Sequence, residues 1–289
     1  MTDGEITFDL NTAQAELKKY MDKYQREHSI ADLAPTVCEL MGVPVPAQNA
    51  ATPLAGVIDQ AGHIFSGSGK AEKILLFCAD AFGDYQQSHA PEIFERIRKI
   101  AGMKVESVSV MPSVTPVCYG SIFTGTAPSI HGITKYEKPV LTVETIFDTL
   151  AAAGKKVAII SSNNCSIDCI FRKRPVDYFS LRDDELSFDM TVQALRTMDY
   201  DVIISYMGGY DSIAHRTGVF SDEAMVQLEL GAERFEKLAA LTDEVWAGKN
   251  RVVALIPDHG QHHISENRGG HGENCEEDML VSHYYRIES

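Results

Sequence analysis

The feature that most constrains the fold is a regular alternation of apolar strands and amphipathic helices, which begins at Lys73. Short apolar runs typical of buried strands occur at 73–80, 104–110, 156–160, 201–207 and 251–256. Helices are predicted between them at 91–102, 142–156 and 221–246, the last two capped by Thr142 and Ser221. Such alternation is typical of a parallel sheet that helices cover on both faces. We therefore expect an α/β fold, a three-layer sandwich with a mostly parallel central sheet.

Residues 1–70 follow a different pattern. The stretch 12–29 places apolar side chains on one helical face, and 30–46 is typical of a second helix that stops at Gly42. The serine- and glycine-rich stretch 66–70 predicts a loop. We expect residues 1–70 to form a helical segment that packs on a main domain of residues 71–289.

The charge balance restricts the partners. Lys and Arg number 26 against 41 Asp and Glu, so the formal net charge is −15. Nucleic-acid polymers and anionic membranes both require a basic face, so we expect neither as a partner. No apolar run approaches the roughly 18 residues of a membrane span. Six scattered cysteines are typical of reduced thiols, which favours the cytoplasm.

Carboxylates follow three of the predicted strands at the point where each strand ends. Asp80 ends the strand 73–80, Asp211 comes shortly after 201–207, and Asp258 follows 251–256. Ligands of such sheets bind at the carboxyl ends of the strands, and we expect the three carboxylates to converge there. Three converging carboxylates repel one another unless cations lie between them.

Three histidines accompany these carboxylates. His215 follows Asp211 by four residues, His259 follows Asp258 directly, and His271 lies among glycines that allow close backbone approach. Taken singly, such residues are more often helix caps, solvated pairs or loop residues. Six together suit two metal ions, roughly 3.5–4 Å apart. Mixed carboxylate and imidazole ligands favour two divalent ions, Zn²⁺ or alternatively Mn²⁺.

A candidate nucleophile follows the strand 104–110. Thr115 precedes Pro116, an order typical of an N-cap followed by the first residue of a helix. The start of a helix offers free N–H groups and a positive dipole end, which suit a phosphate. A threonine hydroxyl is inert at its free pKa and needs a metal to become an alkoxide. Ser113 and Ser121 are rival hydroxyls, and we expect Ser121 to lie inside the helix.

In combination and in order, these motifs resemble the alkaline phosphatase superfamily, most closely its nucleotide pyrophosphatase/phosphodiesterase branch. The resemblance runs from about Lys73 to about Tyr284 and includes an Asp after the first strand, Thr-Pro-x4-Ser-x2-Thr-Gly with a later His-Gly, Asp-x3-His, Asp-His-Gly and a final His-Gly. It implies an alkaline-phosphatase-like fold in which residues 71–289 form the catalytic domain. It also implies two metal sites beside the nucleophile Thr115, one formed by Asp211, His215 and His271, the other by Asp80, Asp258 and His259.

The resemblance also directs attention to three further residues. Cys118 stands three residues after Thr115, where the branch usually has an Asn that helps to hold a phosphate oxygen, and a thiol is a poor donor. Tyr119 and Tyr210 lie close in sequence to the expected site and are candidates for stacking on a base or an aromatic ester. We therefore expect Cys118, Tyr119 and Tyr210 to contact the substrate.

The sequence favours a two-metal phosphodiesterase that acts on a small phosphorylated substrate. A phosphomonoesterase, a phosphonate hydrolase of the same superfamily, and a catalytically idle protein that binds metal and phosphate stay open as alternatives. Phosphoglycerate mutases of the superfamily carry a large inserted domain, for which residues 134–200 are too few. Sulfatases need a Cys-x-Pro-x-Arg motif, and this chain has Thr115 and Pro116 at that place.

Overall fold

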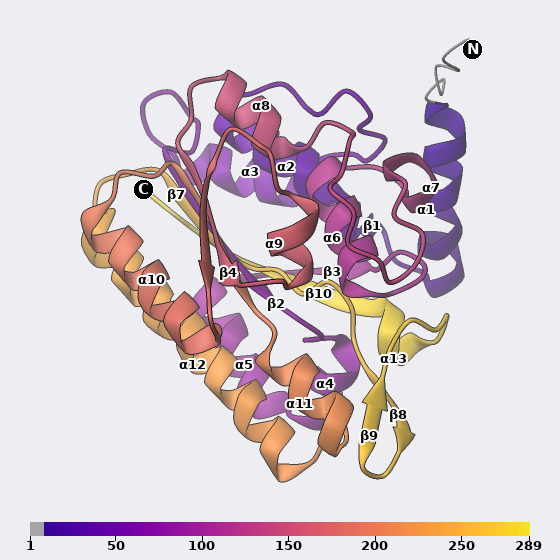
Figure 1. The fold of residues 1–289 in the computed structure, drawn as a ribbon. Helices are drawn as coiled ribbons and strands as arrows, with labels where there is room; N and C mark the ends of the chain where they lie inside the picture. The colour runs from indigo at the N-terminus through magenta and orange to yellow at the C-terminus, as the bar shows by residue number, and fades with distance from the viewer. Residues whose placement is uncertain (1–8) are drawn as a thin grey trace.

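The computed structural model describes residues 9–289 as a central sheet between two layers of helices (Figure 1). The eight strands of the sheet are β1 (His28–Ser29), β2 (Lys73–Ala79), β3 (Met103–Val108), β4 (Val157–Ser162), β5 (Asp177–Leu181), β6 (Val202–Met207), β7 (Arg251–Leu255) and β10 (Leu280–Glu288). Their order is β1-β3-β10-β7-β2-β6-β4-β5. All neighbours pair in parallel except β10, which is antiparallel to β3 and β7. The expected three-layer α/β fold with a mostly parallel sheet is confirmed.

Strand β2 shows how the sheet divides two apolar cores. Ile74 and Leu76 belong to one buried cluster, whereas Leu75 and Phe77 belong to the other, because successive side chains of a strand point to opposite faces. The first cluster is covered by α1 (Leu10–Tyr24), α2 (Leu33–Met41), α3 (Ala55–Ile64), α6 (Thr115–Thr124), α8 (Ile146–Ala152) and α9 (Ser166–Ile170). The second is covered by α5 (Pro91–Ala101), α10 (Asp184–Thr197), α11 (Gly209–Thr217) and α12 (Asp222–Val245).

The N-terminal segment contributes both helices and a strand. Leu33 and Val37 of α2 lie in the same apolar cluster as Ile74 of the sheet, and β1 pairs in parallel with β3 at its edge. The helix expected over 12–29 ends earlier, at Tyr24, because Gln25 adopts a left-handed conformation with φ of 53°. Residues 1–8 of the expected segment lie outside the described part of the chain.

Two caps were predicted with different success. The Ser221 hydroxyl accepts a hydrogen bond from Ala224 N at 3.1 Å and caps α12, as expected. The helix expected from Thr142 begins at Ile146 instead, and its cap is Thr145. Both the amide and the hydroxyl of Thr145 donate to Asp148, at 2.8 and 2.9 Å, and these two hydrogen bonds stabilise the start of α8.

Short elements complete the chain around the carboxyl edge of the sheet. They are a 3₁₀ turn at Ile30–Asp32, α4 (Asp84–His89), α7 (Pro128–His131), α13 (Glu276–Met279) and the hairpin of β8 (His262–Ser265) with β9 (Arg268–Gly270). The hairpin lies against α11 beside the ends of the strands (Figure 1). Among residues 9–289, no helix combines the length and the hydropathy that crossing a membrane requires.

Candidate active site

Three neighbouring strands bring the predicted carboxylates together. In the sheet, β2 lies between β7 and β6. Asp80 directly follows β2, Asp258 lies just after β7, and Asp211 lies in the first turn of α11, which begins shortly after β6. Because these strands are parallel, their carboxyl ends meet at one edge, and the convergence expected from the sequence is present.

Asp80, Asp258 and His259 form the first candidate metal group. Their ligand atoms lie within 4.8 Å of one another. His259 Nε2 is 3.4 Å from Asp80 Oδ1 and 3.3 Å from Asp258 Oδ2. Those two carboxylate oxygens are buried and form no hydrogen bond with any residue of 9–289. An unpaired buried carboxylate is costly, so this group fits a divalent cation, which would balance both charges.

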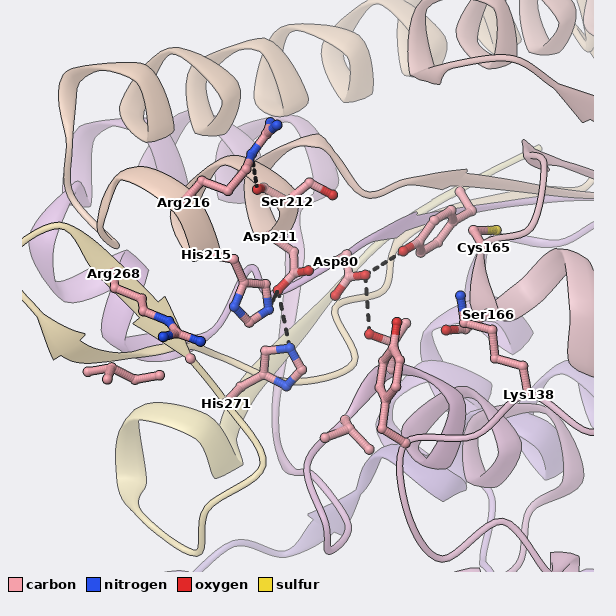
Figure 2. A pocket seen from close by; sticks show the side chains of 16 residues that line it. Asp80, Lys138, Cys165, Ser166, Asp211, Ser212, His215, Arg216, Arg268 and His271 are labelled. Atoms are coloured by element: carbon pink, nitrogen blue, oxygen red, sulfur yellow. Dashed lines mark hydrogen bonds and ion pairs between the residues drawn. The ribbon is translucent and has the colours of Figure 1, made fainter.

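Asp211, His215 and His271 form the second candidate metal group, again within 4.8 Å (Figure 2). Asp211 Oδ1 lies 3.2 Å from His215 Nε2 and 3.3 Å from His271 Nε2. Gln261 Nε2 donates to the same oxygen at 3.2 Å, a contact that nothing in the sequence signalled. Two imidazoles and one carboxylate are a donor set that Zn²⁺ prefers.

Backbone carbonyl groups orient all three imidazoles in the same way. Each Nδ1 lies at hydrogen-bond distance from a carbonyl oxygen: His215 from Gly269 at 3.1 Å, His259 from Gly260 at 2.9 Å, and His271 from Ser113 at 2.9 Å. A hydrogen on Nδ1 leaves the lone pair on Nε2, and each Nε2 faces a carboxylate of its own group. A neutral ring held in this orientation would present the lone pair of Nε2 to a metal ion.

Burial controls the charges of the first group. Burial, reinforced by the charge of Asp211, raises the pKa of Asp80 to about 7. Burial together with the nearby Asp80 raises the pKa of Asp258 well above its usual range, and burial lowers that of His259 well below. Without a cation these groups therefore favour their neutral forms, whereas bound divalent ions would favour the ionised carboxylates.

The second group differs from the first in the protonation of its side chains. The hydrogen bond and charge of Asp211 outweigh burial and raise the pKa of His271 to about 9. Conversely, the hydrogen bonds from His215 and His271 outweigh burial and hold the pKa of Asp211 below its usual value. Asp211 is thus ionised even without a metal, because the imidazole groups of His215 and His271 stabilise its charge.

Thr115 and Tyr206 both present a hydroxyl group to Asp80 at this centre. Thr115 Oγ1 lies 3.4 Å from Asp80 Oδ2 and 3.3 Å from His259 Nε2, and the residue lines the cavity above the two groups. Thr115 is the first residue of α6 and Val114 its N-cap, a shift of one position from the expected start. The rivals face elsewhere, since Ser113 Oγ donates to the Glu273 carbonyl group and Ser121 Oγ contacts His131.

The cavity has a volume of about 740 Å³, within the range of about 300–1,000 Å³ typical of small-molecule sites. Besides Thr115 and four of the six proposed ligands, its lining includes residues that the sequence did not indicate, among them Tyr136, Lys138, Ser166, Arg216 and Arg268. Arg216 adjoins His215 in sequence and Arg268 precedes His271 by three residues, which is the signal that could have found them. The others lie in a loop and in α9, whose approach to the site only the fold reveals.

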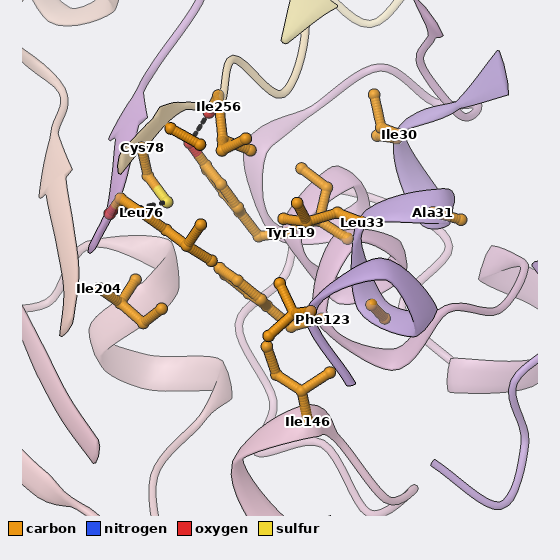
Figure 3. Packing of buried hydrophobic residues seen from close by; sticks show 14 of the residues in the cluster. Ile30, Ala31, Leu33, Leu76, Cys78, Tyr119, Phe123, Ile146, Ile204 and Ile256 are labelled. Carbon is orange, nitrogen blue, oxygen red and sulfur yellow. Dashed lines mark hydrogen bonds between the residues drawn. The ribbon is translucent and has the colours of Figure 1, made fainter. Parts of the chain in front are cut away.

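The three expected substrate contacts are wrong, because all three residues belong to the core. Every residue of α6 is buried and the cavity reaches only its first residue, so Cys118 contacts Ser109 while Tyr119 stacks on Phe123 (Figure 3). The Tyr119 hydroxyl donates to a backbone carbonyl oxygen at 3.4 Å. Tyr210 is 2% exposed and donates to the Val219 carbonyl oxygen at 2.9 Å. None of the three lines the cavity.

Several solved structures share this fold. Murine ectonucleotide pyrophosphatase/phosphodiesterase 5, an inactive variant in complex with AMP, matches with a TM-score of 0.55 and 17% identity over 68% of this chain and 59% of its own. Phosphonoacetate hydrolase from Sinorhizobium meliloti, in complex with phosphonoacetate, matches with 0.52 and 18% over 70% and 61%. A 2-O GAG sulfatase matches with 0.54 and 12% over 75% and 64%. At these identities the likeness shows the fold alone.

The chain spans about three fifths of the length of the structures it resembles. A comparison with curated protein sequences gives no match. The family comparison is decisive, because residues 75–286 match the type I phosphodiesterase/nucleotide pyrophosphatase family, from the first strand of the alternating pattern into β10. This protein therefore belongs to the type I phosphodiesterase/nucleotide pyrophosphatase family.

Proposed function

We propose that this protein is a two-metal phosphoric ester hydrolase that cleaves small phosphodiesters with Thr115 as its nucleophile. The observation that carries the proposal is the position of Thr115 Oγ1, 3.4 Å from Asp80 and 3.3 Å from His259 on the wall of the cavity. Family membership supports a phosphorylated substrate, as does the AMP bound to the similar murine protein.

The two residue groups would each hold one divalent ion, Zn²⁺ or alternatively Mn²⁺. The first group, Asp80, Asp258 and His259, would hold one ion beside Thr115, and the second group, Asp211, His215 and His271, would hold the other. When bound, the ions supply electrostatic stabilisation of the negative charge that develops on the phosphoryl oxygens. The pre-oriented imidazoles and the unpaired carboxylate oxygens support this assignment.

The residues of the chain then carry the chemistry in two steps. Thr115 Oγ1 attacks phosphorus in line, forming an O–P bond as the bond from phosphorus to the leaving oxygen breaks. The Oγ1 proton, directed toward Asp80 Oδ2 in the structure, passes to solvent water as the attack begins, and the leaving oxygen takes up a proton from solvent water as it departs. Water then hydrolyses the phosphothreonine and restores the hydroxyl. The N-terminus of α6 adds the positive end of its dipole to the same phosphate position.

A paired rate assay tests the proposal. Metal-reconstituted protein is given bis(4-nitrophenyl) phosphate and, separately, 4-nitrophenyl phosphate, with Thr115→Ala as the blank. We expect faster cleavage of the diester and no cleavage by the blank. Faster cleavage of the monoester would make the protein a phosphomonoesterase. Absence of Thr115-dependent cleavage of either ester would contradict the proposed mechanism.

A further inference from the structure

We infer that the substrate carries a second anionic group, a carboxylate or a phosphate, which Arg216 and Arg268 recognise beside the phosphorus that Thr115 attacks. The inference rests on the proposed function for the position of the reacting phosphorus. It goes beyond that function by naming the chemical class of the substrate.

The two arginines reach the cavity from different elements. Arg216 belongs to α11 and directly follows His215, whereas Arg268 begins β9. Both line the cavity, and their side chains lie on either side of His215 (Figure 2). Both residues are exposed. A ligand bound above the metal groups would therefore meet two guanidinium groups on the side of His215.

Neither guanidinium group is neutralised within the described chain. Arg216 Nε donates to the Ser212 carbonyl oxygen at 3.1 Å, and no carboxylate of residues 9–289 lies within 4.0 Å of either arginine. Other arginines of the described chain are paired: Arg172 lies 2.6 Å from an Asp168 oxygen and Arg174 lies 2.7 Å from an Asp148 oxygen. The two cavity arginines thus retain donors for a ligand.

The local charge balance favours a substrate with a second anion. Two divalent ions against the carboxylates of Asp80, Asp211 and Asp258 leave a net charge of +1. A bound phosphodiester, with one negative charge, balances that surplus completely. The charges of Arg216 and Arg268 then remain, facing the cavity of a protein whose net charge is −15. A further anion on the substrate is the group that would balance them.

The planar shape of the guanidinium groups restricts the chemical class of the second anion further. A guanidinium group presents a planar fork that matches the oxygens of a carboxylate or a phosphate. Lys138 is the other cation of the cavity, but it lies near Ser166 on the opposite side of Asp80, and its Nζ donates to the Asn164 carbonyl oxygen at 2.8 Å (Figure 2). Recognition of the second anion is therefore assigned to the two arginines.

Three 4-nitrophenyl phosphodiesters test this inference, since they share the reacting group and the leaving group. Their other ester group is 2-carbamoylethyl, 2-carboxyethyl or 2-phosphonooxyethyl, which is neutral, a carboxylate or a phosphate. We expect the wild-type protein to show at least about tenfold higher kcat/KM for one of the charged esters than for the amide, the advantage typical of a charge-assisted hydrogen bond. The better of the two charged esters identifies the second anion.

Variants of the two arginines test whether these residues cause the preference for a charged ester. Arg216→Gln and Arg268→Gln should each lower kcat/KM for the preferred charged ester about tenfold and change that for the amide ester less than about twofold. The matched control is Arg98→Gln, which removes the same charge from α5, away from the cavity, and should leave all three rates unchanged. Equal rates for the three esters, or equal losses on all of them in the arginine variants, would overturn the inference.

A binding measurement separates this inference from the proposed function. Calorimetry with Thr115→Ala protein measures the affinity for the same three esters without turnover. Tighter binding of a charged ester, lost in Arg216→Gln or Arg268→Gln made in that background, supports the second anion site even if the wild-type protein cleaves none of them. Thr115-dependent cleavage without any preference in rate or binding would leave the proposed function standing and remove this inference.

Discussion

Thr115 Oγ1 lies 3.3 Å from His259 Nε2, so the hydroxyl group adjoins one candidate metal group and not the other. Asp80 of the same group lies 3.4 Å away. Thr115 follows β3, whereas Asp80 follows β2 and His259 follows β7. Three strands of the sheet therefore supply the proposed nucleophile and the two groups beside it. This relationship assigns different tasks to the two groups, since the group of Asp211 lies beyond Asp80 and faces the rest of the cavity (Figure 2).

Substitutions at Thr115 should separate the hydroxyl from the shape of the side chain. Thr115→Ser keeps the oxygen and should retain activity within about tenfold, whereas Thr115→Val keeps the branched shape and should lose about 10³-fold or more in kcat. Diester cleavage and metal content are measured on both variants. Ser113→Ala serves as the control, because Ser113 does not line the cavity. Activity of Thr115→Val near that of the wild type would exclude Thr115 as nucleophile.

Asp258→Asn should lower the metal content by about one ion for each chain. Asp258 is fully buried and one of its oxygens has no partner, so the amide would lose the charge that holds a cation of the first group. The ion of the second group should stay. Elemental mass spectrometry of the purified protein gives the ratio, with Asp199→Asn as a control on the surface. An unchanged ratio would remove Asp258 from the ligands.

His131 should make the protein less stable in acid. Burial lowers the pKa of His131 to about 4, whereas an unfolded histidine titrates near 6.5. Between these values the unfolded chain binds more protons, so the free energy of unfolding falls as the pH decreases from about 6.5 to about 4, by about 3 kcal/mol in total. His131→Gln should remove this contribution from urea unfolding curves recorded across that range.

A second buried histidine contributes to the same loss of stability in acid. Burial also lowers the pKa of His283 to about 4, so part of the acid sensitivity should persist in His131→Gln. A variant whose stability depends on pH as steeply as that of the wild type would show that His131 does not titrate in this way.

Gly218→Ala should disturb the hairpin beside the site. Gly218 has a φ of +103°, and an added Cβ would lie 2.4 Å from the backbone oxygen of Glu266 in the hairpin turn. We expect a loss of about 1–3 kcal/mol of stability and reduced activity, because the hairpin carries Arg268 and the carbonyl group that orients His215. Gly154→Ala is the matched control, with φ of +76° and open space around the added carbon. Equal losses in the two variants would show that only backbone strain matters.

The sequence predicted the sheet edge well, for a physical reason. Asp80 and Asp258 each follow an apolar run, and the carboxyl ends of parallel strands must meet, so local pattern alone determines the convergence. The two groups implied by the resemblance are among the three groups of the described residues whose ligand atoms lie within 4.8 Å of one another. The orientation of the imidazoles was not predictable, because it depends on carbonyl groups such as Gly269 and Ser113 that only the tertiary fold brings near.

The errors have equally specific causes. Tyr119 follows Thr115 by one helical turn, a spacing that suggests a shared face of the helix. However, α6 is buried on every side, and the spacing of its residues does not indicate this burial. Strand β10 was missed because it contains polar residues such as Ser282, His283 and Arg286 and lacks a continuous apolar run. The sequence could not show that Arg216 and Arg268 lie at the same cavity, since α11 and β9 meet only through tertiary packing.

The placement of β10 has a consequence for how the protein can assemble during synthesis. Within the sheet, β3 pairs with β1 on one side and with β10 on the other, so β10 alone joins the strand leading to Thr115 to the strands leading to Asp80, Asp211 and Asp258. Residues 280–288 follow all the other strands and leave the ribosome after them. Until then, the two parts of the sheet expose unpaired edges, a hazard for aggregation. The proposed nucleophile and its cations therefore come together late, so a nascent chain stalled before residue 280 should contain both parts and no working enzyme.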